Sequence, residues 1–260
     1  LTQALNNRNL PTLDLNTLNQ TDLTNSVLLL PDAFTSAYEA PLVLATYDLF
    51  TQLGFQVYVA PPLRSGKPLH VLGFAQRFNA IAQQNIEYLS QLRSLNLPLI
   101  GIEPSLTLTY RDEYASITNQ PPNVQLPQEF LLNHLDRVPK VADAQPYQLF
   151  GHCHEKAIAP SSQQQWQQLF TAAGLSLTLI ETGCCGMAGL YGYQAEHLET
   201  SRSIYRLSWE AHLPDAAHMQ KTVLATGLSC RSQVERLSHW RPLHPLQALQ
   251  QVLAQHLNKT

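Results

Sequence analysis

The chain has 260 residues, of which 44% are hydrophobic and 13% charged, and a formal net charge of -3. This apolar content excludes an intrinsically disordered chain, and four Cys and 11 Gly exclude disulfide scaffolds and collagen-like repeats. With 16 Lys and Arg against 19 Asp and Glu, and no basic run, the charge pattern also excludes a surface for the phosphate backbone of nucleic acids. We therefore expect no nucleic-acid partner.

The apolar runs are too short to cross a membrane. The longest, VLLL at 27–30 and LPLIGI at 97–102, fall far below the roughly 18 residues that a span requires. Residues 1–16 lack the basic start and apolar centre of a secretory signal, so we expect a cytoplasmic protein whose thiols stay reduced. Because the first residue is Leu, we also expect a fragment or a processed product.

Short apolar runs alternate with longer amphipathic stretches along the chain. The runs predict strands at 27–30, 55–59, 97–102, 147–150, 175–180 and 221–226. The helical patterns between them include 41–53, 76–95, 162–173 and 196–211. This alternation predicts an α/β fold, with parallel sheets flanked by helices and Rossmann-like in layering.

The sequence also contains an internal repeat. LFTQLG at 49–54 matches LFTAAG at 169–174, an offset of 120 residues. At the same offset LLPDAF at 29–34 aligns with LFGHCH at 149–154, and RSG at 64–66 with CCG at 184–186. After a further gap of four residues, IGIEPSL at 100–106 aligns with LATGLSC at 224–230.

The repeat predicts the domain organisation. An N-terminal lead at 1–25 precedes a first repeat at 26–120, and the second repeat follows at 146–260. Residues 121–145 between the repeats are rich in Pro and predict a connector with one short helix near 130–135.

All four cysteines belong to the second repeat, and each follows a predicted strand. They are Cys153, Cys184, Cys185 and Cys230, and they align with Ala33, Arg64, Ser65 and Leu106 of the first repeat. Because open α/β sheets place their sites at the carboxyl ends of the strands, we expect the three loops to bring the thiols together. Four thiolates are the ligand set that Zn or an iron-sulfur cluster needs.

Other interpretations of these residues stay open. Free cysteines are often inert core residues, and His152 and His154 beside Cys153 are further candidate metal ligands. Glu155 and Lys156 are interpreted as a surface pair, and residues 111–113 as a solvated helix turn. The sequence shows neither a phosphate-binding glycine loop nor a nucleophile elbow.

Three motifs of the second repeat resemble the cysteine-rich CCG domain family: GHCHEKA at 151–157, TGCCGMAG at 182–189 and ATGLSCRSQ at 225–233. That family occurs in heterodisulfide reductase and in the iron-sulfur subunits of glycolate oxidase and anaerobic glycerol phosphate dehydrogenase. It also forms the C-terminal region of FAD-linked D-lactate and D-2-hydroxyglutarate type dehydrogenases, to which this chain is most similar. RSGKPLHVLGF at 64–74 and EPSLTLTYRDEY at 103–114 match the family's first copy with its cysteines replaced.

The resemblance implies a non-catalytic module of an FAD-linked oxidoreductase of D-2-hydroxy acids. Its four cysteines would bind an iron-sulfur cluster or Zn and serve electron transfer. FAD would lie in a domain absent from this chain, and the partners would be flavin and ferredoxin-like domains of the same parent protein or of a partner subunit. Several family members carry a further cysteine three residues after the last one, where this chain has Gln233.

Two alternatives remain beside this implication. The chain could be a structural or interaction domain that docks on a flavoprotein, with zinc or no metal. It could also be a thiol-redox site that acts through Cys184 and Cys185.

Overall fold

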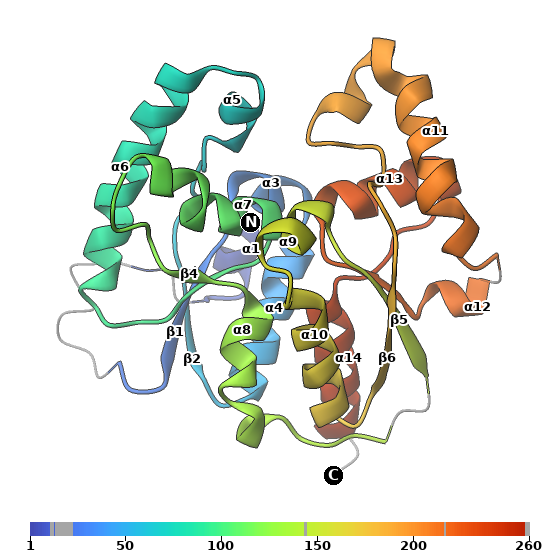
Figure 1. Ribbon diagram of the computed structural model, residues 1–260. Coiled ribbons are helices and arrows are strands. Elements are labelled where there is room, and N and C mark those ends of the chain that lie inside the picture. Colours follow the sequence, from blue (N-terminus) through green and yellow to red (C-terminus); the bar gives the residue numbers. More distant parts are fainter. Residues whose placement is uncertain (11–12, 14–22, 143–144, 216, 258–260) are drawn as a thin grey trace. The chain divides into compact units, whose positions relative to one another are not determined.

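The computed structural model describes residues 1–10, 13, 23–142, 145–215 and 217–257 (Figure 1). The chain divides into two compact units, Leu1–Arg137 and Val138–Thr260. Part of the predicted N-terminal lead, residues 11–12 and 14–22, lies outside the described residues, and its described part includes helix α1 (Thr2–Asn7).

The first unit is built on a parallel sheet. Its strands are β1 (Ser26–Leu30), β2 (Gln56–Val59), β3 (Leu99–Gly101) and β4 (Val124–Gln125), in the order β2-β1-β3-β4. The three strands predicted here are confirmed. Strand β4 was not predicted, because two residues in a Pro-rich segment are too few to show an alternating pattern.

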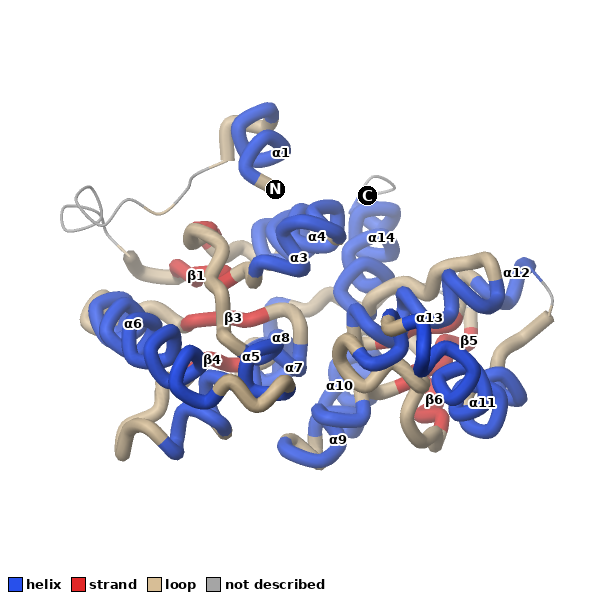
Figure 2. The backbone as a smooth tube through the Cα atoms, turned by 90° about the horizontal axis from the view of Figure 1, so that it is seen from above, coloured by secondary structure: helices blue, strands red, loops and turns tan. Residues whose placement is uncertain are grey.

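Helices cover both faces of this sheet. They are α3 (Ala33–Tyr38), α4 (Ala40–Gln52), α5 (Lys67–Val71), α6 (Ala75–Arg93), α7 (Pro104–Arg111) and α8 (Pro127–Leu132), with short 3-10 turns at Glu113–Ser116 and Leu135–Arg137. The predicted connector therefore contributes β4 and α8 to the first unit. Figure 2 shows α6 on one side of the sheet and α4 and α8 on the other.

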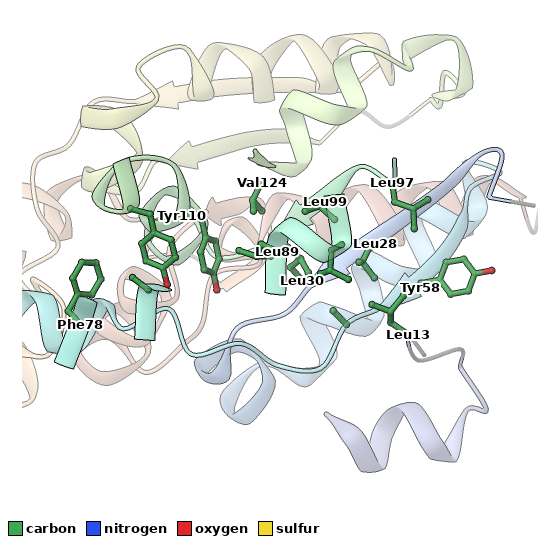
Figure 3. Packing of buried hydrophobic residues seen from close by; sticks show 14 residues of the cluster. Leu13, Leu28, Leu30, Tyr58, Phe78, Leu89, Leu97, Leu99, Tyr110 and Val124 are labelled. Atoms are coloured by element: carbon green, nitrogen blue, oxygen red, sulfur yellow. The ribbon is translucent and has the colours of Figure 1, made fainter. Parts of the chain in front are cut away.

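Alternate residues of β1 face the two layers, as the pleat of a strand requires. Leu28 and Leu30 belong to a buried cluster that includes Phe78 and Leu89 of α6 (Figure 3). On the other face, Phe50 of α4 stacks on Phe130 of α8 with ring centroids 5.7 Å apart. A strand that is buried on both faces explains why VLLL is a continuous apolar run.

The second unit repeats this topology. Its parallel strands are β5 (Pro146–Phe150), β6 (Ser176–Ile180) and β7 (Val223–Ala225), in the order β6-β5-β7. The pairing of β1 with β2 starts at Ser26 and Gln56, and that of β5 with β6 starts at Pro146 and Ser176, 120 residues later on both strands.

The third strand of each unit confirms the gap in the alignment. Leu28 of β1 pairs with Leu99 of β3, and Gln148 of β5 pairs with Val223 of β7, so the third strand is shifted by 124 residues. The strand register thus agrees with the sequence repeat residue by residue, and the prediction of two similar α/β repeats is confirmed.

The helices of the second unit are α9 (Cys153–Ile158), α10 (Ser162–Ala172), α11 (Leu198–Ser208), α12 (Ala217–Gln220), α13 (Leu228–Ser238) and α14 (Pro245–Leu257). Short 3-10 turns lie at Tyr191–Tyr193, Ala195–His197 and Glu210–His212. Helices α9 and α13 begin two or three residues after a strand and carry few apolar residues, so their amphipathic pattern is weak.

Aromatic residues fill both sides of the second sheet. Phe150 of β5 contacts Trp209, directly after α11, with ring centroids 4.9 Å apart, and Tyr147 of β5 contacts Phe170 of α10 at 5.6 Å. Figure 2 accordingly shows α10 and α11 on opposite sides of this sheet. In the described part of the chain, none of the helices has both the length and the apolar character to span a membrane.

His244, directly before α14, gives the second unit a pH-dependent stability. Its Nδ1 accepts a hydrogen bond from the Leu246 N–H at 3.1 Å, and complete burial together with the positive charge of Arg231 lowers its pKa well below the ordinary value. The unfolded chain therefore binds a proton that the folded chain does not, as the pH falls through about 6.5.

We predict that the free energy of unfolding falls on acidification below about pH 6.5, with a slope of up to ~1.4 kcal/mol per pH unit from this residue. His244→Asn, which keeps an acceptor for the Leu246 N–H, should flatten that slope, whereas His212→Gln at an exposed position should not. Urea titrations between pH 5 and 8 measure this through tryptophan fluorescence, since Trp166, Trp209 and Trp240 all lie in the second unit. Equal slopes in wild type and His244→Asn would contradict the assignment.

Candidate functional site

The four cysteines lie at the carboxyl ends of three adjacent strands. Cys153 is the first residue of α9 after β5, Cys184 and Cys185 lie in the loop after β6, and Cys230 is the third residue of α13 after β7. Because β5 is hydrogen-bonded to β6 on one side and β7 on the other, their carboxyl ends bring the three segments to one edge of the sheet.

The four thiols contact one another in series. The Cys184 sulfur accepts hydrogen bonds from the thiols of Cys153 and Cys185, and Cys185 also contacts Cys230. The backbone N–H of Gly186 donates to the Cys184 sulfur at 3.3 Å. The structure therefore places the four predicted ligands together.

Cys184 is the thiol that most readily carries a negative charge. Hydrogen bonds from the thiols of Cys153 and Cys185, and then from backbone N–H groups, lower the pKa of Cys184. Conversely, donation to Cys184, together with burial, raises the pKa values of Cys153 and Cys185. Thiolates are the metal-binding and nucleophilic form of cysteine, so the reactive sulfur of the group is that of Cys184.

The group of four thiols has an open side, where the cysteines are accessible to solvent, and a closed side, where they are buried. Cys153 is exposed and Cys184 is partly exposed, whereas Cys185 and Cys230 are 3% and 2% exposed. The two buried thiols pack in an apolar cluster that includes Trp209, directly after α11. Within the described residues, Cys153 and Cys184 are the thiols that solvent or a partner can reach.

Two glycines allow the close approach of these loops. Gly186 has a φ of +88°, and a Cβ atom there would lie 2.2 Å from the Ser201 carbonyl oxygen. A Cβ atom on Gly227 would lie 2.3 Å from the His152 ring and 3.2 Å from the Cys230 sulfur. Both positions therefore exclude larger residues, Gly186 by conformation and Gly227 by space.

The two predicted histidines occupy different surroundings. His152 is 7% exposed, and its ring packs against Gly227, with Nε2 at 3.4 Å from the Ser229 hydroxyl. His154 is partly exposed, and its ring centroid lies 6.5 Å from that of His152. His152 is thus a close neighbour of the Cys230 segment, and a ligand role for either ring stays a prediction.

The donor set suits a soft metal. Two sulfurs bound to one tetrahedral Zn at ~2.3 Å are about 3.8 Å apart, which is contact distance for sulfur atoms. Among the described residues, no group of three or more His, Cys, Asp or Glu side chains already surrounds a point where a metal ion could sit. The thiols therefore fit the chemistry of Zn or an iron-sulfur cluster in the kind of donor atom that they supply.

The residue three positions after Cys230 has a structural role. Gln233 is fully buried, its Nε2 donates to the Ser201 hydroxyl at 3.0 Å, and its Oε1 accepts from Arg236 at 2.6 Å. The side chain thereby ties α13 to α11. At this position a side-chain amide joins two helices.

Glu155 departs from the sequence interpretation as a surface residue. Its carboxylate is completely buried, and the hydroxyl groups of Ser162 and Thr226 both donate to it. Burial raises the pKa of Glu155, and the two hydroxyl donors oppose that shift. Sequence reasoning missed this residue because α9 is too short for its hydrophobic pattern to reveal a buried face. Its partners Ser162 and Thr226 also lie 7 and 71 residues away in the sequence.

The first unit fills its corresponding edge with other side chains. The Tyr114 hydroxyl donates to the Ser65 carbonyl oxygen at 2.9 Å and accepts from Asn85 at 2.8 Å, while Asn85 also donates to the Arg64 carbonyl oxygen at 2.7 Å. The Ala33 N–H donates to the Leu63 carbonyl oxygen at 3.1 Å. Tyr114 and Asn85 thus bind the backbone of the loop that aligns with the cysteine pair.

The turn at residues 111–113 is more structured than a solvated turn. Arg111 pairs with Glu129 of α8 at 2.8 Å, and Glu113 forms an ion pair with Lys67 of α5. Burial lowers the pKa of Lys67 to about 8. The turn therefore links α7 to α8 and α5, a role that only the folded chain reveals.

The chain is similar to parts of longer proteins. It is 43% identical to a D-2-hydroxyglutarate dehydrogenase of Pseudomonas putida over 230 residues, which cover 87% of this chain and 22% of that protein. It is 40% identical to the D-2-hydroxyglutarate dehydrogenase of Pantoea ananatis over 243 residues, which cover 92% of this chain and 24% of that protein. The chain thus spans less than a quarter of the length of these relatives.

A more distant similarity reaches a second kind of oxidoreductase. The chain is 27% identical over 198 residues to one of the subunits of the anaerobic glycerol-3-phosphate dehydrogenase of Escherichia coli, and the match covers 73% of this chain and 49% of that protein. No protein-family model matches the chain.

The conformation of Gly186 yields a prediction about the stability of the fold. Gly186→Ala should lower the free energy of unfolding by more than the ~1–2 kcal/mol of left-handed strain, because the Ser201 carbonyl group must also move. Gly189→Ala, in the same loop with a φ of +69° but exposed, should show the strain alone. Urea unfolding measures both effects.

The same variants report on the closed side of the site. In the reduced, metal-free chain we expect Cys184, which is partly exposed and most readily loses its proton, to react with a thiol reagent faster than the buried Cys185 and Cys230. Gly186→Ala should accelerate labelling of Cys185, and Gly189→Ala should leave it unchanged, as mass spectrometry can quantify. Equal labelling of all four thiols in the wild-type chain would contradict the burial described above.

Proposed function

We propose that this chain is the cysteine-rich module of an FAD-linked oxidoreductase that oxidises a D-2-hydroxy acid. The module binds an iron-sulfur cluster or Zn through Cys153, Cys184, Cys185 and Cys230 and serves electron transfer in the parent protein. The flavin and ferredoxin-like portions lie outside this chain, in the same parent protein or a partner subunit, and the protein is cytoplasmic.

The observation that carries this proposal is the contact of four thiols at one edge of a parallel sheet. Cysteines that serve only as core residues have no reason to gather on three loops, and the first unit builds the same topology without any. The similarity to D-2-hydroxyglutarate dehydrogenases over most of this chain supports the assignment to that class of oxidoreductase.

The residues of the site would have distinct tasks. Cys185 and Cys230 would bind from the dry side, where the apolar cluster around Trp209 excludes water. Cys184, which most readily loses its proton, would bind first, and the Gly186 N–H would stabilise its charge. A bound iron-sulfur cluster would supply one-electron transfer, whereas Zn would supply structural stability alone.

The exposed side of the site determines where electrons could enter. Cys153 is exposed at the start of α9, and Leu190 and Tyr193 in the segment after the cysteine pair are 37% and 59% exposed. Exposed apolar residues of this kind suit a transient contact with another protein domain. A redox partner would therefore approach the module from the side of Cys153.

One observation favours the second candidate, an interaction domain that docks on a flavoprotein with zinc or no metal. In the first unit Val71, Leu72 and Phe74 are 54%, 51% and 49% exposed and lie close together in sequence at the tip between α5 and α6. Neighbouring exposed apolar residues of this kind mark a surface that another protein covers. This candidate needs no electron transfer through the thiols.

The identity of the bound group can be tested on anaerobically purified protein. We expect about four thiolates to hold either iron with inorganic sulfide, which colours the protein, or a single colourless Zn. Elemental analysis, sulfide determination and the visible spectrum together distinguish the two. Protein that is purified without oxygen, binds neither iron nor zinc and takes up neither on reconstitution would overturn the metal-binding part of the proposal.

Cys153→Ser in the full-length parent protein separates the two functions. Because Cys153 is exposed, its replacement should change the stability of the metal-free chain by less than ~0.5 kcal/mol. With an iron-sulfur cluster, the variant should reoxidise its reduced flavin at least tenfold more slowly than wild type in stopped-flow measurements. With structural Zn, flavin reoxidation should be unchanged and the metal-dependent melting temperature should fall by several degrees.

Ala157→Ser, another exposed position on α9, is the matched control and should behave as wild type in both assays. A Cys153→Ser variant with unchanged flavin reoxidation and an unchanged melting temperature of the metal-loaded protein would contradict both functions of the thiols.

A further inference from the structure

A buried carboxylate lies directly behind the thiol group. Glu155, two residues after Cys153, has no exposed surface, and both of its oxygens accept hydrogen bonds. The Ser162 hydroxyl donates to Oε1, and the Thr226 hydroxyl donates to Oε2 at 2.5 Å. The Thr226 oxygen in turn accepts from the backbone N–H of His152 at 2.9 Å.

These bonds connect two of the three cysteine-bearing segments. Glu155 belongs to α9, which begins with Cys153, and Thr226 lies between β7 and the Cys230 helix α13. Hydrogen bonds to a carboxylate are stronger than those between neutral groups, and a buried carboxylate that loses a donor is destabilising. The network therefore holds the Cys153 and Cys230 segments at a fixed separation.

The internal repeat provides a comparison with the same topology. In the first unit the residues that align with Glu155, Ser162 and Thr226 are Thr35, Leu42 and Ile102. All three are buried, and Leu42 and Ile102 cannot donate a side-chain hydrogen bond. Thr35 instead donates to Asp32, three residues earlier in the chain.

The comparison shows that the fold can form without the hydrogen bonds of Glu155. The first unit forms the same strand order and the same register without this network. The network occurs in the unit that carries the cysteines, whereas in the first unit Leu42 and Ile102 are apolar and the remaining polar contact, Thr35 with Asp32, stays within the start of α3.

We propose that Glu155 is a positioning residue which, through Thr226 and Ser162, sets the spacing of Cys153 and Cys230 for a metal or cluster. This inference rests on the proposed function, according to which all four thiols bind one metal or cluster. Outer residues that orient the ligands of a metal typically change its affinity by about 10–100-fold when they are replaced.

The test uses Co²⁺ as a probe of the reduced, full 260-residue chain under anaerobic conditions. Thiolate-bound tetrahedral cobalt has a sulfur-to-metal charge-transfer absorption and visible bands that depend on the ligand geometry. Thr226→Val removes one hydroxyl with little change of shape. The triple variant Glu155→Thr, Ser162→Leu, Thr226→Ile installs the residues of the first unit.

We expect both variants to weaken Co²⁺ binding at least tenfold and to change the visible bands, with helical circular dichroism spectra like that of wild type. Glu155→Gln retains the shape and an acceptor oxygen and should remain within about threefold of wild type. Glu181→Gln, an exposed carboxylate three residues before Cys184, is the matched control and should have no effect.

The outcomes separate this inference from the proposed function. Wild-type affinity and wild-type bands in Thr226→Val would overturn the positioning role, whether or not the triple variant folds. A wild-type chain that binds no Co²⁺ would count against the metal site itself, and the positioning role would then be decided by thiol labelling. In that case we expect Thr226→Val to accelerate labelling of Cys230 at least tenfold, and an unchanged rate would overturn the role.

Discussion

The parallel pairing of β5 with β6 and β7 is the constraint on which the thiol site depends. Parallel strands point their carboxyl ends to one edge, so any residue placed just after a strand meets the residues that follow its neighbours. The cysteines need no long-range contact of their own to find one another. They follow the central strand β5 and the two strands that flank it, and the backbone hydrogen bonds of the sheet bring them together.

The two units show how one topology accommodates different edges. In the second unit thiols, two close-packed glycines and a buried carboxylate occupy the loops. In the first unit the corresponding loops are joined by Tyr114 and Asn85, whose hydrogen bonds end on backbone carbonyl groups. The two sheets share one strand register although their loops differ. In each unit the strands bury their own side chains, so the sheet forms with either set of loop residues.

The chemistry of the thiols follows from their different exposure. Cys185 and Cys230 sit in an apolar cluster, and hydrogen bonding to Cys184 together with burial raises the pKa of Cys185. Cys184 receives hydrogen bonds from its neighbours and carries charge more easily. The thiol with the lowered pKa is thus partly exposed, and its neighbour with the raised pKa is buried.

The sequence by itself determined the repeat, the six longer strands and the positions of the four cysteines, because these depend on local patterns and on an alignment of the chain with itself. The strand register of the structure agrees with that alignment, since equivalent residues of the two sheets pair alike. Strand β4 and helices α9 and α13 were missed because they are short or weakly amphipathic. Only the tertiary structure decided that Glu155 is buried, that Gln233 joins two helices and that Cys184 accepts from two other thiols, because each depends on partners brought by distant segments.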